Sequence, residues 1–300
     1  MAEVTGSIEQ AAPRSGWQRF WDRGGWWRAF LFAVLYIAVY LGVGLLVGVL
    51  GIGPDSSDDL LDSADTVLTG LLLPILVMCL LLVAFLATMR WRREVFGPQP
   101  IAGRPWMWIA VVLVLVPVVL HLVATSWSSY DVTLVLTVLA LGLCIGFAEE
   151  VLTRGVAVTM LRRAGYGERA VMVLSSVLFA LLHATNLTSG QDLTLVGVTV
   201  VYAFGFGTMM YLSMRVTGSI VPAILLHAAT DPTAILATGG VDSHGANAGS
   251  DALNAFAGTF NVVYVAVAIL AIFLVSGRVG SPRRRGAEEL PTPAQGDHGA

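Results

Sequence analysis

Eight long apolar runs, joined by short polar loops, most constrain how this chain can fold. They cover approximately residues 30–50, 67–89, 106–124, 132–148 and onward, 170–185, 193–212, 219–238 and 256–275. As helices rising about 1.5 Å per residue, these runs cross, or nearly cross, the roughly 30 Å of bilayer hydrocarbon. With 12% charged residues among 300, the chain could not coat a soluble globule of this size. The sequence therefore predicts an all-α, multi-pass integral membrane protein.

Apart from Arg154, arginine is confined to the two chain ends and to alternate connections between these runs. The arginine-bearing segments are 14–28, 90–104, 162–169, 215 and 278–285. The other loops contain no arginine, and two of them carry aspartates instead. Under the positive-inside rule this alternation predicts eight transmembrane helices with both termini cytoplasmic. The absence of lysine and the tails rich in small residues favour a bacterial cell membrane as the location.

The chain divides by composition into five segments. Residues 1–28 are expected to form a cytoplasmic tail and an interfacial stretch in which tryptophan alternates with arginine. Residues 29–130 hold the first three spans, 131–238 a functional core, and 239–276 an external loop and the last span. Residues 277–300, rich in Pro, Gly, Ala and Arg, are expected to be a disordered basic tail.

Small residues and prolines inside the spans predict local packing. Glycines spaced along the first and sixth spans favour close helix contacts, and three prolines are expected to kink their helices. The glycines are Gly42, Gly44, Gly48, Gly205 and Gly207, and the prolines are Pro74, Pro117 and Pro222. The two cysteines, Cys79 and Cys144, both lie in apolar runs, so no disulfide framework is expected.

Charged side chains at the end of the fourth run are the most informative feature. Glu149, Glu150 and Arg154 follow a run that carries no charge. Ionisable groups at membrane depth cost about 2.5–3.5 kcal/mol each on insertion scales, so they mark functional sites. Glu150 and Arg154 are four residues apart on one helix face and should form an ion pair. Glu149 lies about 100° around the helix and is left available.

Three helices should bring polar groups to one depth. Counting from the cytoplasmic arginines, Glu149, His183 and His227 each lie 12 to 14 residues into the bilayer, or about 18–21 Å. Asp231 is four residues after His227 and can reach the same cavity. His121 has no polar companion in its span and is expected to be a hydrogen-bonded structural histidine.

The pattern excludes several intramembrane chemistries. The sequence has no H-E-x-x-H motif, which argues against a zinc site built on one helix. It also lacks a G-x-S-x-G motif for a serine nucleophile, and Asp231 is the sole aspartate within a span, so no aspartate pair is available.

Three ordered motifs carry a family resemblance: Glu149-Glu150-x-x-x-Arg154, Phe179-x-x-x-His183 followed by Asn186, and His227-x-x-x-Asp231. Over residues 133–234 the chain resembles the CPBP family of intramembrane proteases, also called the CAAX protease and bacteriocin-processing or Abi family. Two positions depart from its usual pattern. Asp231 replaces the commoner asparagine, and Thr153 replaces an aromatic residue that often precedes the arginine.

The resemblance implies an intramembrane endopeptidase in which Glu149 activates water. It also implies that His183 and His227 either stabilise the oxyanion or, with Glu149, bind a metal such as Zn²⁺. A metal-free mechanism stays open, with Glu149 as the general base. Arg154 is expected to fix Glu150, or less favourably to meet a substrate carboxylate.

Two other function classes stay open. The protein could be a non-proteolytic immunity or scaffold protein that binds a peptide such as a bacteriocin, since the family is associated with bacteriocin self-protection. A transporter is a third reading, although no inverted repeat favours it. The expected partners are bilayer lipid and a peptide or membrane-protein substrate, with no nucleic acid.

Overall fold

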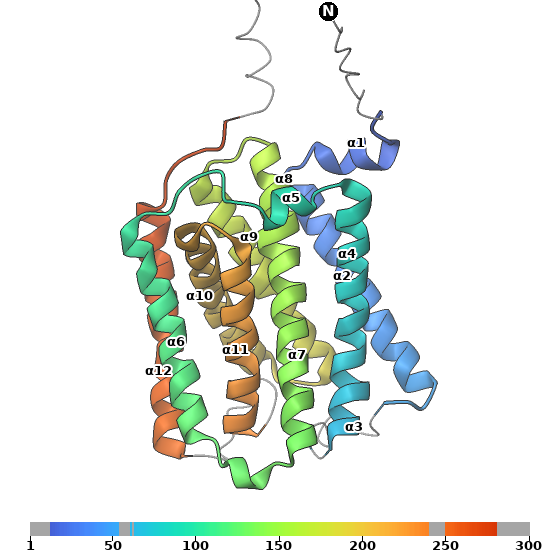
Figure 1. The fold of residues 1–300 in the computed structure, drawn as a ribbon, viewed down its shortest axis with the longest axis vertical. Coiled ribbons are helices and arrows are strands. Elements are labelled where there is room, and N and C mark those ends of the chain that lie inside the picture. Colours follow the sequence, from blue (N-terminus) through green and yellow to red (C-terminus); the bar gives the residue numbers. More distant parts are fainter. Residues whose placement is uncertain (1–12, 54–60, 62, 240–249, 281–300) are drawn as a thin grey trace, which may run out of the picture.

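The computed structural model describes residues 13–53, 61, 63–239 and 250–280, and these residues form helices and connecting loops (Figure 1). Eight helical stretches in this part of the chain are long and apolar enough to cross a membrane. They are Trp26–Val49, Ala64–Met89, Pro105–Ala124, Val132–Arg163, Glu168–Ser189, Leu193–Thr217, Ile220–Thr238 and Asp251–Leu274. The predicted number of spans and the all-α fold are confirmed.

Several stretches contain more than one element. The long helices are α2 (Trp26–Val49), α4 (Leu73–Met89), α6 (Trp108–Ala124), α7 (Val132–Glu150), α9 (Glu168–Leu182), α10 (Leu193–Thr217), α11 (Ile220–Thr238) and α12 (Asp251–Leu274). The short ones are α1 (Gly16–Asp22), α3 (Ala64–Val67), η1 (Leu68–Leu72), α5 (Arg92–Phe96), η2 (Pro105–Met107), η3 (Trp127–Ser129), η4 (Val151–Ala157), α8 (Val158–Arg163) and η5 (His183–Ser189). Of these, η1 and η4 are π-helical, and η2, η3 and η5 are 3-10 helices.

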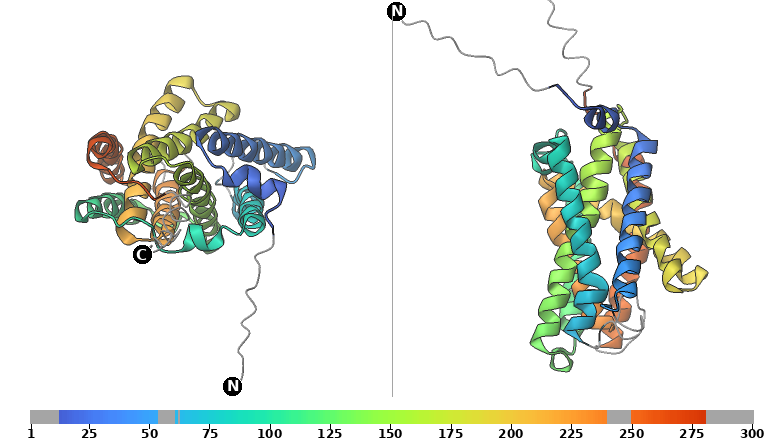
Figure 2. Two further views of the ribbon diagram at one scale, coloured as in Figure 1. Left: turned by 90° about the horizontal axis from the view of Figure 1, so that it is seen from above. Right: turned by 90° about the vertical axis from the view of Figure 1, so that its right-hand side faces the viewer.

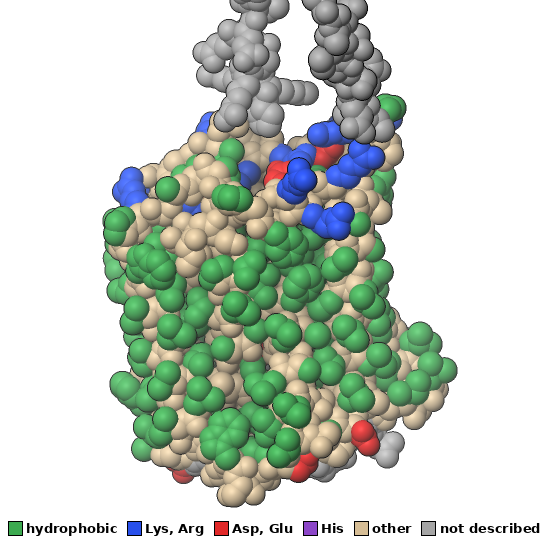
Figure 3. Space-filling model, in the orientation of Figure 1, with side chains coloured by type: hydrophobic (Ala, Val, Ile, Leu, Met, Phe, Trp, Pro, Cys, Tyr) green, Lys and Arg blue, Asp and Glu red, His purple; other side chains and the backbone are tan. Residues whose placement is uncertain are grey.

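The spans form one bundle with α7 and α11 near its middle (Figures 1 and 2). In Figure 1, α6 and α12 lie on one side of this pair and α2 and α4 on the other. Arginine side chains gather at one end, and a hydrophobic belt covers the face below them (Figure 3). We call this end the arginine end. Helix α1 and residues 275–280, which follow α12, also lie there (Figure 1), and the positive-inside rule predicts that this end is cytoplasmic.

Glycine lets α7 and α11 approach closely. A Cβ atom built on Gly146 would lie 2.6 Å from the backbone nitrogen of Ala228, and one on Gly142 would lie 2.4 Å from Cδ of Pro232. Real side chains could not fit at either distance. This is the most extensive helix–helix contact in the described bundle, and it fixes the position of His227 relative to Glu149.

The glycine predictions have mixed outcomes. Gly205 packs against Tyr264 of α12, and Gly207 packs against Phe179 of α9, as expected for close helix contacts. The prediction for the first span is wrong in this structure. Gly42, Gly44 and Gly48 of α2 have open space where a side chain would project, because α2 lies at the edge of the bundle and exposes much of its surface.

The proline and cysteine predictions can also be checked. Pro222 lies in the first turn of α11, where there is no preceding helical carbonyl to clash with, so its predicted kink is wrong. Pro117 lies inside α6 and Pro232 inside α11, and Pro74 begins α4 directly after the π-helical turn η1. Cys79 and Cys144 are free thiols, as expected.

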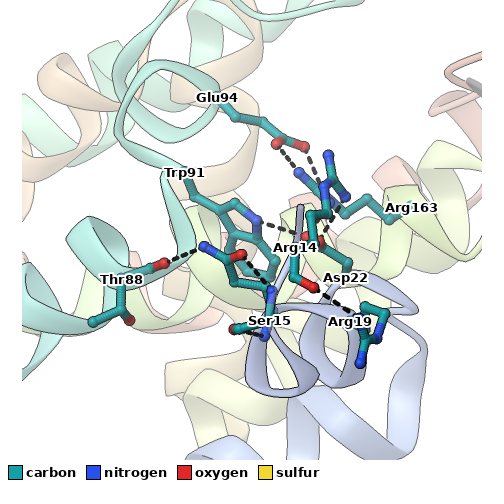
Figure 4. A network of polar contacts seen from close by, with 9 residues as sticks. Arg14, Ser15, Arg19, Asp22, Thr88, Trp91, Glu94 and Arg163 are labelled. Atoms are coloured by element: carbon teal, nitrogen blue, oxygen red, sulfur yellow. Dashed lines mark hydrogen bonds and ion pairs between the residues drawn. The ribbon is translucent and has the colours of Figure 1, made fainter. Parts of the chain in front are cut away.

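Helix α1 docks onto the arginine end instead of lying wholly in lipid (Figure 4). Asp22 accepts hydrogen bonds from Arg163, Arg14 and, at 3.0 Å, the Trp91 indole nitrogen. The indole of Trp21 is buried, whereas three neighbouring tryptophans are exposed. The interfacial segment is therefore also a packed part of the bundle.

Candidate active site

A cavity of about 640 Å³ lies inside the bundle and is lined by Glu149 of α7, His183 of η5, and His227 and Asp231 of α11. The helices on which the sequence placed these groups therefore converge on one space. Glu150 and Arg154 do not line it. They lie behind the cavity wall, where Glu150 contacts His227 and Arg154 contacts Glu150.

Glu150 is the centre of a buried polar network. Its Oε1 atom accepts a hydrogen bond from Arg154 Nη1 at 3.1 Å and is paired with His227 Nδ1 at 2.9 Å. The side chains of Glu150 and Arg154 are both fully buried, which confirms the predicted pair at i and i+4. The other Arg154 contacts are to the hydroxyl of Thr153 and the carbonyl of Gly207. Because the guanidinium is enclosed in this way, Arg154 cannot meet a substrate carboxylate without rearrangement.

A π-helical turn shapes this network. The α-helical pattern of α7 ends at Glu150, and η4 continues the helix with wider turns from Val151 to Ala157. Turns of this kind often occur at functional sites. The guanidinium of Arg154 also lies 4.6 Å from the ring centre of Phe179. A side chain at Gly207 would meet Arg154 Nη2 at 2.9 Å, so glycine leaves the room that the arginine fills.

His227 is held in a fixed orientation between the two glutamates. Its Nδ1 faces Glu150, and its Nε2 lies 3.4 Å from Oδ2 of Asp231 and 3.9 Å from Oε2 of Glu149. Phe179 and Phe206 pack against the imidazole with centroid distances of 5.6 and 5.1 Å. The contact between Nδ1 and Glu150 therefore fixes the orientation of the ring, and Nε2 faces the cavity.

Glu149 lines the same space and has one carboxylate oxygen without a hydrogen bond. Its Oε2 atom is buried and has no hydrogen-bond partner among the described residues, and its side chain is 20% exposed. Such an oxygen needs a partner, because an unpaired buried acceptor is costly. A water molecule or a substrate group in the cavity would supply one.

His183 begins the 3-10 helix η5, where α9 ends. Its Nδ1 lies 3.2 Å from the carbonyl oxygen of Phe179, which leaves Nε2 for the cavity. Glu149 and His183 are close enough to interact electrostatically. Two imidazoles and one carboxylate therefore share the cavity.

The donor chemistry of these three residues suits zinc, and a carboxylate on the second nitrogen of a ligating histidine is common at such sites. Their arrangement does not. In the described part of the chain, no three His, Cys, Asp or Glu side chains are placed so that they could hold one metal ion. The mechanism below therefore assigns no step to a metal.

Sequence reasoning missed two polar groups of the cavity, Tyr36 of α2 and Asn254 of α12, and placed a third, His121 of α6, outside the site. All three residues line the cavity. The Tyr36 hydroxyl, His121 Nδ1 and Asn254 Oδ1 are buried without a hydrogen-bond partner in the described chain. The expectation that His121 is a hydrogen-bonded structural histidine is thus wrong for Nδ1. Tyr36 and Asn254 are uncharged, and a search for ionisable groups in the spans passes over them.

Two family models match the chain. The model described as type II CAAX prenyl endopeptidase Rce1-like matches residues 131–233 and contains all six predicted site residues. A model described as cation transporting ATPase, C-terminus, matches residues 3–155, so the chain is similar to it over its first spans. That second match ends before His183, His227 and Asp231. No significant match was found among curated proteins or among solved structures.

Proposed function

The chain belongs to the CPBP family through its Rce1-like type II CAAX prenyl endopeptidase region, and we propose that it hydrolyses a peptide bond within the membrane, with Glu149 activating the attacking water. One observation carries this proposal. The partly exposed carboxylate of Glu149 lines the cavity, with its Oε2 atom 3.9 Å from Nε2 of His227, whose other nitrogen is fixed by Glu150.

In the first step, a water molecule held by Glu149 attacks the carbonyl carbon of the scissile bond. The water proton passes to Glu149, and the carbonyl oxygen takes on negative charge. General bases of this kind contribute about 10²- to 10⁴-fold to rate. In the second step, the carbon–nitrogen bond breaks and Glu149 returns the proton to the leaving amine.

His227 is suited to stabilise the oxyanion. Both of its ring nitrogens face carboxylate oxygens, which accept hydrogen bonds and cannot donate them. An imidazole donates from both nitrogens when it is protonated, so Nε2–H can serve the oxyanion. The unpaired hydroxyl of Tyr36 is a further donor at the cavity wall.

The buried pair behind the wall has a positioning role in this proposal. Glu150 orients His227, and Arg154 compensates the charge of Glu150 in a region without water. Fixed donors need no reorganisation as charge develops, which is the main source of their catalytic effect.

Comparative membrane proteomics tests the function. Cells producing the wild-type protein should contain truncated forms of at least one membrane protein or peptide, and cells producing Glu149→Gln should accumulate its full-length form. Identical proteomes would oppose an endopeptidase. A phenotype that survives replacement of Glu149, His183 and His227 together would instead support peptide binding without proteolysis.

A further inference from the structure

The active-site cavity extends from Glu149 in one direction along the bundle. On α6, which starts at the arginine end, the lining residues are Pro117 and His121 in its far half. On α12, which runs back toward the arginine end, they lie between Asp251 and Tyr264, in its first half and just beyond. The cavity therefore reaches toward the arginine-poor end. Since α7 starts there at Val132, Glu149 lies about 26 Å from that end at 1.5 Å per residue.

Toward the arginine end the cavity is closed by packed side chains. Every residue of η4 is buried, from Val151 to Ala157. On the facing helix α10, Met209, Met210 and Leu212 have no exposed surface. The ion pair of Glu150 and Arg154 lies among these packed side chains and is fully buried. Water and substrate therefore cannot reach Glu149 through this half of the bundle without repacking it.

The open half contains polar groups that no described residue satisfies. They are the Tyr36 hydroxyl, His121 Nδ1 and Asn254 Oδ1, which come from three different helices. Tyr36 also interacts electrostatically with Glu149. Buried polar atoms are normally hydrogen-bonded. Unpaired groups on helices from both sides of α7 and α11 therefore indicate a hydrated path between these helices that can accept a polypeptide backbone.

Apart from His227, which is protonated in the proposed mechanism, the charged groups on this path are carboxylates. Glu149, Asp231 and Asp251 line it. No arginine does so in the described chain, because arginine is gathered at the opposite end. A cleft lined by one sign of charge concentrates ligands of the other sign. A substrate with a free carboxylate would be disfavoured here, and a neutral or positively charged segment would be favoured.

We propose that the substrate reaches Glu149 from the arginine-poor end, as a neutral or positively charged polypeptide segment exposed on that side of the membrane. This inference builds on the proposed function. If the arginine end is cytoplasmic, as the positive-inside rule predicts, the protein cleaves membrane proteins or peptides at their external side.

Thiol labelling in membranes tests the direction and the charge together. In a Cys79→Ala, Cys144→Ala background, single cysteines replace three residues. Asn261 lines the cavity, Ser128 is exposed at the arginine-poor end, and Arg92 is exposed at the arginine end. Intact cells and inverted vesicles are treated with two membrane-impermeant methanethiosulfonates of similar size, one with a trimethylammonium group and one with a sulfonate.

Cysteines at positions 261 and 128 should react from the same side, and the cysteine at position 92 should react from the opposite side. At position 261, the ratio of cationic to anionic reagent rates should be about tenfold higher than at position 128 at low salt. Labelling of position 261 from the side of position 92, no labelling from either side, or faster reaction with the sulfonate would each overturn the inference. If the cysteine-free background does not fold, mass spectrometry of labelled sites in the native background gives the same comparison.

This measurement does not require activity. A Glu149→Gln variant that still cleaves would refute the proposed function and leave the labelling pattern unchanged. The two failures are therefore distinguishable.

Discussion

Replacing Gly146 with alanine should move α11, which carries His227, away from α7, which carries Glu149, without removing any catalytic group. The new Cβ atom would lie 2.6 Å from the backbone nitrogen of Ala228 and 2.8 Å from the carbonyl oxygen of Ile224. Both are backbone atoms of α11, so no side-chain rotation can relieve the clash. Ordinary contact begins at about 3.4 Å, and α11 must therefore withdraw from α7 by about 0.8 Å.

That displacement falls on the residues that carry the chemistry. His227 precedes Ala228 on α11, and Glu149 lies on α7, with 3.9 Å between Nε2 and Oε2. A misplacement of about 1 Å can cost roughly 10²-fold in rate, which corresponds to about 2.7 kcal/mol. We therefore expect Gly146→Ala to lower kcat about 100-fold while the eight-span fold is retained.

The assay is the initial rate of cleavage of a substrate found by membrane proteomics, with thermal denaturation in detergent to confirm folding. Gly44→Ala is the matched control, because a side chain there meets nothing within 4 Å. It should leave the rate unchanged. A folded Gly146→Ala protein with wild-type turnover would refute the reasoning, since the α7–α11 contact would then not set the site geometry.

Three further predictions follow from buried groups. Glu168 accepts hydrogen bonds from Arg162 and Arg215 and is fully buried, so Glu168→Ala should destabilise the protein by about 3–5 kcal/mol in chemical denaturation. Glu94→Ala, which breaks a more exposed pair, should cost about 0–1 kcal/mol. Tyr36→Phe should leave the stability of the protein unchanged and lower kcat at least about tenfold, because the unpaired hydroxyl of Tyr36 is free to serve the reaction. Tyr264→Phe removes a hydrogen bond to the Leu113 carbonyl, so it should mainly lower stability, by about 1 kcal/mol. Dialysis against a chelator should leave turnover unchanged, whereas a loss that zinc restores would support metal binding by the active-site glutamate and histidines.

The sequence predicts best where one physical rule dominates. The length of the apolar runs sets the number of transmembrane spans, and the arginines in alternate loops set the predicted orientation of the spans in the membrane. Glu150 and Arg154 pair because two opposite charges four residues apart on one helix face stabilise each other in a dry interior. Counting residues from the arginines was enough to place Glu149, His183 and His227 on one cavity.

The remaining features depend on which helix faces which, and a single sequence does not carry that information. Gly42 and Gly146 sit in similar apolar surroundings along the chain, yet one faces open space and the other touches a backbone. Trp21 resembles an interfacial residue but is the buried residue of α1. His121 has no polar neighbour in its own span, and its cavity partners come from other helices.

The most direct test of the central claim is the cleavage rate of purified Glu149→Gln protein relative to wild type, measured on the same substrate in the same detergent. Glutamine keeps the size of the side chain and cannot take a proton from water. The account predicts a fall of at least about 10³-fold in kcat with folding unchanged, near the upper range for general bases. Full turnover by the folded variant would contradict it.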